Sequence, residues 1–226
     1  MKKIIIIISM LYISILNAGA PAPKDINFLP NAPHTFSNVT NLSVGLEWDK
    51  GFINEFIKKS NLYKLSQPIS GGVSVFKAKK HKDFSNLNGA YIWVDVIGLD
   101  NNKISRLVIS GVYGKDNLIS DVMALVYKLN VYNGSSKFIL INNKASVRTS
   151  VRKKNVLNMV FEISDNCTKS SGNYKIFSLS SNNILNKSII DWESEKVCKA
   201  KPKSVVFSGI LNGYKINKLL WAEYSE

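Results

Sequence analysis

The sequence has little histidine or cysteine from which to build a catalytic or metal centre. Its 226 residues include two histidines, His34 and His81, and two cysteines, Cys167 and Cys198. A zinc site needs three or four such ligands close together, and neither histidine lies near a cysteine in the sequence. The nucleophile elbow, the phosphate loop and the dinucleotide fingerprint are also missing. We therefore expect no metal and no cofactor.

Acidic residues are also scarce, because 16 Asp and Glu stand against 30 Lys and Arg, for a formal charge of +14. Basic residues gather in three short clusters, Lys77-Lys79-Lys80-Lys82, Arg148-Arg152-Lys153-Lys154 and Lys196-Lys199-Lys201-Lys203. Such clusters are most often solvated faces, and attraction to anionic lipids, anionic glycans or nucleic acid is the alternative. Nucleic acid is disfavoured as a partner, since no cluster carries the glycine and aromatic pattern of an RNA-binding sheet.

Only one long apolar run is present, and it lies at the N-terminus. Lys2 and Lys3 precede an apolar run over residues 4–16, and Ala18-Gly19-Ala20 follows it. This order is typical of a secretory signal peptide, and polar residues interrupt the run before it reaches the roughly 18 apolar residues of a spanning helix. We predict a signal peptide at 1–20, cleaved after Ala20 or Ala18, and export to the periplasm or the medium. An uncleaved anchor is the alternative; no second span follows.

Export changes what the two cysteines are expected to do. In an oxidising compartment two thiols of one chain tend to pair. We therefore predict one disulfide between Cys167 and Cys198, with two unpaired buried cysteines as the alternative.

About ten strands are predicted, at 42–48, 73–78, 90–97, 104–113, 137–142, 145–151, 156–163, 174–179, 204–207 and 215–221. Several show apolar residues at every second position, whereas 90–97 and 104–113 are nearly continuous apolar runs, typical of central strands covered on both faces. Helical spacing predicts a short helix that Asp49 caps and that ends near Ile57, and a second one over 116–126. The expected fold class is mainly β (α+β), a single curled or closed antiparallel β-barrel with two short helices. This domain covers 39–226, after an extended proline-rich arm at 21–38.

Carboxylates and tryptophans inside the predicted strands are the candidate site residues. The carboxylates that interrupt apolar segments are Glu47, Glu55, Asp95 and Glu162. A buried carboxylate needs a partner and tends to mark a site, but alternation also allows each of them to face solvent. The tryptophans on predicted strands are Trp48, Trp93 and Trp221, which we expect in the core or lining a barrel, with a ligand platform as the alternative. Trp192 lies between two acidic residues and fits either role.

The order of elements resembles the acetoacetate decarboxylase family over residues 38–138. Residues 39–57 are similar to the family's first strand and the helix after it, and Gly72–Ala78 to its next strand. Residues 86–91 fall at its Pro-Tyr-x-Glu-like turn, and 113–132 at its Tyr-x-Asp...Gly-Arg-Glu stretch. The resemblance implies a curved antiparallel β-barrel that encloses a pocket for a small acid.

The catalytic motifs of that family are missing. Near the family's Schiff-base lysine this chain reads Tyr127-Lys128-Leu129-Asn130-Val131, so the position falls near Val131 and Lys128 is an offset catalytic candidate. Gly89 and Ala90 stand where the turn would supply a catalytic glutamate, and the Gly-Arg-Glu element is absent. An amine nucleophile must be desolvated or placed beside another cation to react near neutral pH.

We therefore predict an exported, non-catalytic β-barrel that binds a small molecule in its interior. The ligand-binding candidates are Glu47, Trp93, Asp95 and Lys128. One alternative is a secreted surface-interaction protein whose basic loops contact anionic glycans or membranes. The other is a residual acetoacetate decarboxylase-like enzyme that uses Lys128.

Overall fold

A computed structural model of the chain describes residues 34–35, 37–57, 62–80, 88–101, 103–114, 130–179 and 185–226. They belong to a compact unit that extends from Asn31 to Glu226. The predicted signal peptide, the predicted helix at 116–126, His81 and Lys128 lie outside the described residues.

Most of the described chain is β-strand. In chain order the elements are β1 (His34–Thr35), β2 (Ser37–Trp48), α2 (Lys50–Phe56), β3 (Lys64–Leu65), β4 (Ser70–Lys80), β5 (Asn88–Asp100), β6 (Lys103–Tyr113), β7 (Asn130–Ile141), β8 (Lys144–Val151), β9 (Lys154–Leu179), β10 (Leu185–Phe207), the 3₁₀-helix η1 (Gly209–Leu211) and β11 (Ile216–Ser225). The mainly-β prediction is confirmed. Within the described residues, no helix has the length and apolar character needed to cross a membrane.

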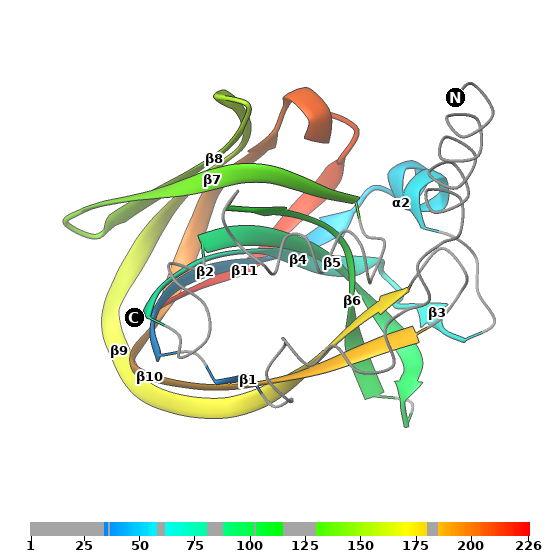
Figure 1. Ribbon diagram of the computed structural model, residues 1–226, viewed down its shortest axis with the longest axis horizontal. Helices are drawn as coiled ribbons and strands as arrows, with labels where there is room; N and C mark the ends of the chain where they lie inside the picture. Colours follow the sequence, from blue (N-terminus) through cyan, green and yellow to red (C-terminus); the bar gives the residue numbers. More distant parts are fainter. Residues whose placement is uncertain are drawn as a thin grey trace, which may run out of the picture. The chain divides into compact units, whose positions relative to one another are not determined.

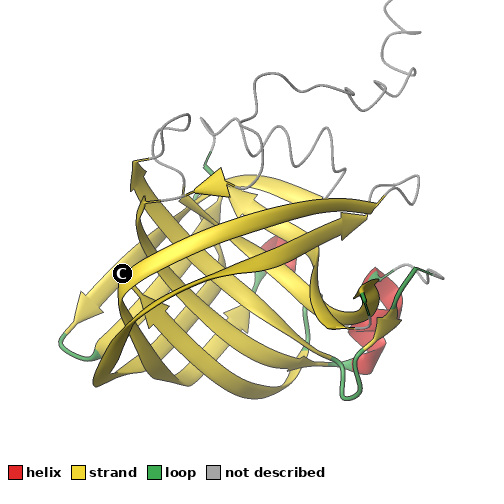
Figure 2. Ribbon diagram, turned by 90° about the horizontal axis from the view of Figure 1, so that it is seen from below, coloured by secondary structure: helices red, strands yellow, loops and turns green. Residues whose placement is uncertain are grey.

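The strands form one 11-stranded sheet that curls strongly (Figures 1 and 2). Its order is β1-β10-β11-β2-β4-β5-β6-β7-β8-β9, with β3 beside β5. Two further pairings connect β9, at one end of this order, with β10 near the other end and with β6 in the middle. Most neighbouring strands are antiparallel, as expected, but the pairs β1–β10, β6–β7 and β6–β9 are parallel.

The connection between β6 and β7 is long enough for the two strands to be parallel neighbours. A parallel neighbour requires a crossover of about a dozen residues or more, whereas antiparallel strands can be joined by a short turn. Strand β6 ends at Tyr113 and β7 begins at Asn130, so the residues between them are enough for such a crossover. The prediction of a wholly antiparallel sheet was wrong here because strand patterns carry no information on direction.

The helix α2 forms where its cap was predicted. The Asp49 side chain accepts a hydrogen bond of 2.9 Å from the Phe52 backbone N–H, which satisfies one free donor of the first turn. Phe52 and Ile53 are buried, and the N–H of Ile57 donates to the Ile53 carbonyl where the helix ends. Among the described residues α2 is the one α-helix, so the second predicted helix is untested.

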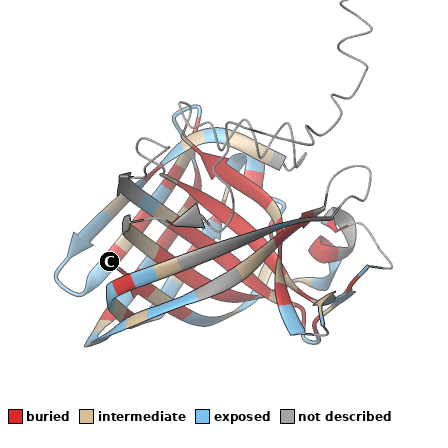
Figure 3. Ribbon diagram, turned by 60° about the horizontal axis from the view of Figure 1, so that its bottom comes forward, coloured by how far each residue is buried: buried red, intermediate tan, exposed pale blue. Residues whose placement is uncertain are grey.

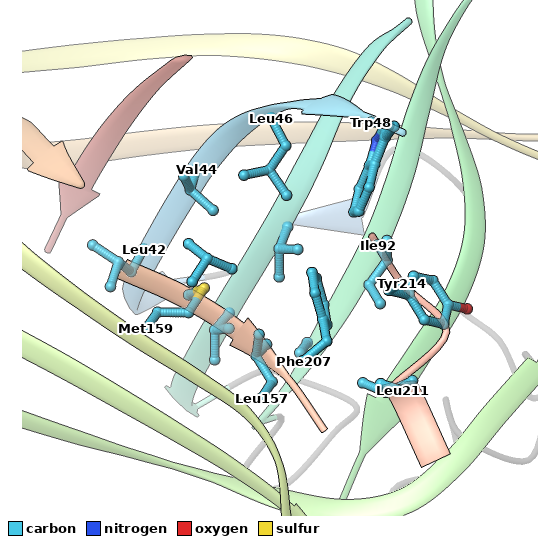
Figure 4. Packing of buried hydrophobic residues seen from close by; sticks show 14 of the residues in the cluster. Leu42, Val44, Leu46, Trp48, Ile92, Leu157, Met159, Phe207, Leu211 and Tyr214 are labelled. Carbon is cyan, nitrogen blue, oxygen red and sulfur yellow. The ribbon is translucent and has the colours of Figure 1, made fainter. Parts of the chain in front are cut away.

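The main core lies on one face of the central strands. Figure 4 shows Leu42, Val44, Leu46 and Trp48 of β2 in one row, facing residues of β9 and β10. The Trp48 ring lies 5.4 Å from the ring of Phe52, and rings of Phe207 and Tyr214 surround it. Trp48 is therefore a core residue, one of the two roles expected for it.

The Asn- and Ser-rich segment after Ile163 is a long ribbon. We expected only a short strand at 174–179, but β9 and β10 have 26 and 23 residues and pair along most of their length. A two-stranded ribbon with much of its surface in water needs no alternation of apolar residues, so the polar composition concealed it. Cross-strand ion pairs from Lys169 to Glu193 and Glu195, at 3.1 and 2.6 Å, join exposed residues of the two strands.

The predicted disulfide is present in this ribbon. Cys167 and Cys198 are directly opposite each other in the β9–β10 register, with Cα atoms 4.2 Å apart. Cys198 is fully buried, so the bridge connects the ribbon to the main core.

Removal of this bridge should destabilise the fold. The bond closes a loop with a sequence separation of 31 residues, so the Cys167→Ala/Cys198→Ala variant should lose about 3–4 kcal/mol of unfolding free energy on the chain-entropy model. Urea denaturation measures this loss. As a control, a reductant should lower the melting temperature of the native protein and leave that of the variant unchanged. Equal melting temperatures of reduced and oxidised native protein would contradict the prediction.

Candidate functional site

Five neighbouring strands, β11, β2, β4, β5 and β6, have a second face on the side opposite the main core. Side chains alternate along a strand, so residues directly opposite on neighbouring strands share a face. Three rows form this face, Lys218-Glu47-Ser70-Asp95-Arg106, Trp221-Gly45-Gly72-Trp93-Val108 and Glu223-Ser43-Ser74-Tyr91-Gly111. We call these residues the polar face. Most of its side chains are polar or aromatic, whereas those of the main core are almost all apolar.

Trp93 and Asp95 lie together at the centre of this face. Trp93 is 1% exposed, and its indole N–H donates a hydrogen bond of 3.1 Å to Oδ1 of Asp95. The Ser70 hydroxyl donates to Oδ2 of the same carboxylate at 2.7 Å. Both carboxylate oxygens are therefore engaged, as a half-buried charge requires.

Arg106 places a positive charge against the Trp93 ring. Its guanidinium carbon lies 4.6 Å from the ring centre, within the range of a cation–π interaction. In the β5–β6 register Arg106 is also directly opposite Asp95. A guanidinium can lie against an aromatic ring, and its fork of N–H groups matches a carboxylate.

Glu223 on β11 is the second acid that interacts with this arginine. Burial raises the pKa of the Glu223 carboxyl, while the positive charge of Arg106 opposes the rise by favouring the ionised form. Arg106 and Glu223 belong to β6 and β11, which lie at opposite ends of the five strands. The charge of Arg106 acts on Glu223 because the sheet curls, which turns the polar face inward and brings β6 and β11 closer together.

Two glycines make room for indole rings on this face. A Cβ atom at Gly72 would overlap the Trp93 ring and the Val44 carbonyl, and one at Gly45 would overlap the Trp221 indole. The rings therefore lie against bare backbone in the middle row. Trp93 is buried and Trp221 is 42% exposed, so the two indoles form an apolar floor that becomes accessible towards β11.

Hydroxyl groups beside this floor are paired among themselves. The Ser43 and Ser74 hydroxyls lie 2.9 Å apart, Ser74 donates to Oδ1 of Asn41 at 2.6 Å, and Nδ2 of Asn41 donates to Ser43 at 3.1 Å. This three-residue network satisfies polar groups that are almost fully buried. It fixes the side chains next to the site without adding a charge.

An aromatic cluster closes one end of the face. The rings of Tyr91 and Trp93 lie 5.6 Å apart, and Phe76 contacts both Tyr91 and Tyr113. Burial raises the pKa of Tyr113 far above its usual range, and Tyr91 adds to the effect. Tyr113 therefore stays protonated at physiological pH.

The predicted site residues have different positions. The structure brings together Glu47, Trp93 and Asp95 on the polar face, whereas Lys128 lies outside the described residues. Glu162 lies on the outer surface, where an ion pair with Lys203 at 2.5 Å lowers its pKa. The side chain of Glu55 lies outside the described part of the chain. In the part of the chain that the structure describes, no three His, Cys, Asp or Glu side chains gather closely enough to hold a metal ion.

Sequence reasoning missed Arg106, Glu223 and Ser70. Each is a single polar residue in an alternating strand, which is also what a solvent-facing residue looks like. One signal was present in the segment Leu42–Trp48, where small and polar residues alternate with large apolar ones. A glycine and a serine on the second face indicate that something other than bulk water contacts it.

Comparison with known proteins gives a fold but no sequence relative. No family model and no curated protein sequence matches this chain. Solved structures of acetoacetate decarboxylases do match, one with a TM-score of 0.65 and 8% identity, and one from Legionella pneumophila with 0.62 and 12%. Each alignment covers 91% of this chain and 87% of the other. The enduracididine biosynthesis enzyme MppR, complexed with pyruvate, matches with a TM-score of 0.55 and 7% identity over 83% of this chain and 84% of its own. These similarities confirm the predicted resemblance at the level of the fold.

The Glu223 carboxyl should make stability depend on pH. Because its pKa is higher in the folded than in the unfolded protein, its contribution to stability is complete below the unfolded value, about 4.3, and is lost as the pH rises through the folded value. The melting temperature of Glu223→Gln relative to the native protein should therefore rise from pH 4 to pH 8.

Glu162→Gln is the matched control, because Lys203 lowers the pKa of Glu162 and the sign reverses. The Glu162 contribution is present at neutral pH and is lost as the pH falls through the folded value, so this variant should lose stability relative to the native protein as the pH rises. Its effect should be small, since the pair is exposed. A flat difference for Glu223→Gln would contradict the assignment.

Proposed function

We propose that the protein is an exported, non-catalytic binding protein that holds a small carboxylate-bearing molecule on the polar face, within a barrel formed by the curled sheet. The observation that carries this proposal is the Arg106 guanidinium, which lies 4.6 Å from the centre of the buried Trp93 ring. A half-buried guanidinium beside an apolar floor suits a ligand with one carboxylate and a small apolar body.

Each part of the face has a defined task in this proposal. The ligand carboxylate accepts paired hydrogen bonds from Arg106, and its apolar part lies on the indoles of Trp93 and Trp221. Asp95 orients the site through its bonds to Trp93 and Ser70. Because the pKa of Glu223 is raised, its carboxyl takes up a proton more readily than a surface glutamate and can then donate a hydrogen bond to the ligand.

The fold supports the chemical class of the ligand. The protein shares its architecture with acetoacetate decarboxylases, and the neighbour MppR has been solved with pyruvate. Pyruvate is a small carboxylate with an apolar methyl group. It is therefore a suitable first probe for a site that consists of one guanidinium and an indole floor.

The composition of the polar face supports binding without catalysis. Among the described residues of this face Lys218 supplies the single amine, and it is exposed, so its amine is not desolvated for attack on a carbonyl. Export remains part of the proposal on the evidence of Lys2, Lys3 and the apolar run at 4–16.

Loss of Arg106 should weaken carboxylate binding. Charge-assisted hydrogen bonds contribute about 1.5–3 kcal/mol, so Arg106→Gln should raise the Kd for pyruvate on the order of 10- to 100-fold. Titration calorimetry and native mass spectrometry measure the effect. Arg148→Gln, which removes an exposed arginine from β8, should leave the Kd unchanged. An Arg106→Gln variant that binds pyruvate as well as the native protein, or a native protein that binds neither pyruvate nor acetate, benzoate or lactate, would refute the proposal.

A residual decarboxylase-like enzyme is the second candidate, favoured by the fold alone. Borohydride reduction in the presence of pyruvate traps a Schiff base as a stable mass increase. We expect no adduct on the native protein. If an adduct forms and Lys128→Ala abolishes it while Lys64→Ala keeps it, the non-catalytic reading is wrong and Lys128 is the nucleophile.

A further inference from the structure

The outer face of β7, β8, β9 and β10 is a second surface of the sheet, made of other strands than the polar face. Its residues follow from the register of these strands in three rows, Ile141-Lys144-Glu162-Lys201, Ile139-Ser146-Val160-Ser204 and Lys137-Arg148-Asn158-Val206. We call these twelve residues the outer patch. The opposite face of the same strands carries buried residues such as Val147, Met159 and Phe161, so the outer patch faces away from the main core.

Large apolar side chains are exposed on the outer patch. Ile139, Ile141, Val160 and Val206 are 39%, 65%, 39% and 52% exposed. A shallow pocket of about 550 Å³ lies beside the first three of them and is also lined by Lys144 and Glu162. Apolar residues in such a group on a folded surface indicate a binding surface more often than isolated ones do.

The turn between β7 and β8 exposes apolar side chains on both of its sides. Leu140 belongs to the opposite face of β7 and is nevertheless 48% exposed, so Ile139, Leu140 and Ile141 form a continuous exposed run beside the turn. The tip of the β7–β8 hairpin projects at one side of the sheet, and the ribbon there is coloured as exposed (Figures 1 and 3).

The turn is held in place. The Asn143 carbonyl accepts a hydrogen bond of 2.7 Å from the N–H of Ile163, and the Asn143 side chain donates to Asp165 at 2.7 Å. Asn142 adopts the left-handed conformation, with φ of 52°, that a tight hairpin turn requires. The exposed run therefore sits on a supported hairpin.

Basic side chains surround the apolar ones. Lys137, Lys144, Arg148 and Lys201 belong to the outer patch, and Lys203 lies beside it. The one acid of the patch, Glu162, is already paired with Lys203. With Asp165, which accepts a hydrogen bond from Asn143 at the turn, the region carries five positive and two negative charges, a net charge of 5 − 2 = +3.

This charge selects among possible occupants. A second copy joined through the same patch would place these like charges against each other, since a two-fold interface is self-complementary. A folded acidic partner would cover one side of the hairpin and leave Leu140 in water. A bilayer interface buries both sides of an inserted turn, and anionic headgroups match the basic rim.

We propose that the outer patch docks on an anionic lipid bilayer, with Ile139, Leu140 and Ile141 inserted among the headgroups. Lys137, Lys144 and Lys201 contact the lipid phosphates. This inference is independent of the small-molecule site, because the two surfaces share no residue.

The test uses a probe at the turn itself. Ile141→Cys introduces a thiol, and a polarity-sensitive fluorophore can be attached to it because Cys167 and Cys198 are paired. Vesicles of phosphatidylcholine with 30% phosphatidylglycerol should shift its emission to shorter wavelength, and vesicles of phosphatidylcholine alone should not. The same fluorophore at Ile104→Cys, on an exposed residue of β6, should show no shift. The N-terminal apolar run is common to both proteins, so it cannot create the difference.

The charge dependence is tested in the labelled protein. Lys137→Gln/Lys144→Gln/Lys201→Gln should weaken vesicle binding on the order of 100-fold at low salt, at roughly fivefold for each lysine. Lys64→Gln/Lys77→Gln/Lys187→Gln, which removes three exposed lysines elsewhere, is the matched control and should weaken binding far less.

Several outcomes would overturn the proposal. They are the absence of a shift at residue 141, an equal shift at residue 104 or on neutral vesicles, and equal effects of the two triple variants. A shift produced by heparin or by an acidic protein, and not by vesicles, would assign the patch to another polyanion.

Discussion

The position of the Trp93 ring determines most of what lies on the polar face. Its N–H fixes Asp95, its surface supports Arg106, and a glycine on the next strand leaves space for it. Its backbone carbonyl accepts a hydrogen bond of 3.1 Å from the indole of Trp48, the central aromatic of the main core. The two faces of the central strands are therefore coupled through one residue, and a change in core packing at Trp48 would also move the site.

The fold could be predicted from sequence wherever one face of a strand is apolar. The near-continuous apolar run over residues 90–97, the alternation over 145–151 and the cap at Asp49 were sufficient for their elements. The long β9–β10 ribbon could not be predicted, because residues 164–173 of β9 are nearly all polar and the pairing there depends on backbone hydrogen bonds and on cross-strand pairs such as Lys169–Glu195. The parallel pairing of β6 with β9 could not be predicted either, because it joins segments about 70 residues apart.

The candidate site was predictable in part for a related reason. Trp93 and Asp95 lie two positions apart on one strand, so their common face is visible in the sequence. Arg106 and Glu223 reach them only through the register of β6 and the curl that brings β11 near. A single arginine in an alternating strand is indistinguishable from a solvent-facing residue until its neighbours across the sheet are known.

The fold and the chemistry of the site carry different weight for function. TM-scores of 0.55–0.65 to the matched structures establish the architecture, and identities of 7–12% leave the residues of the site free to differ. In this chain the polar face combines a guanidinium, two acids and an indole floor, and its one amine is exposed. The architecture is thus shared with the matched structures, while the chemistry of this face has to be argued from its own residues.

The covalent bridge between Cys167 and Cys198 also affects how the chain responds to proteases. A cut anywhere between these residues would leave the two fragments joined, with the β9–β10 register on either side of the bridge still defined by its backbone hydrogen bonds. None of the polar-face residues lies between the two cysteines, but Ile176 of that segment pairs with Arg106 and packs against the aromatic cluster around Trp93. The bridge would therefore keep the fragments together, whereas a cut near Ile176 would disturb the polar face.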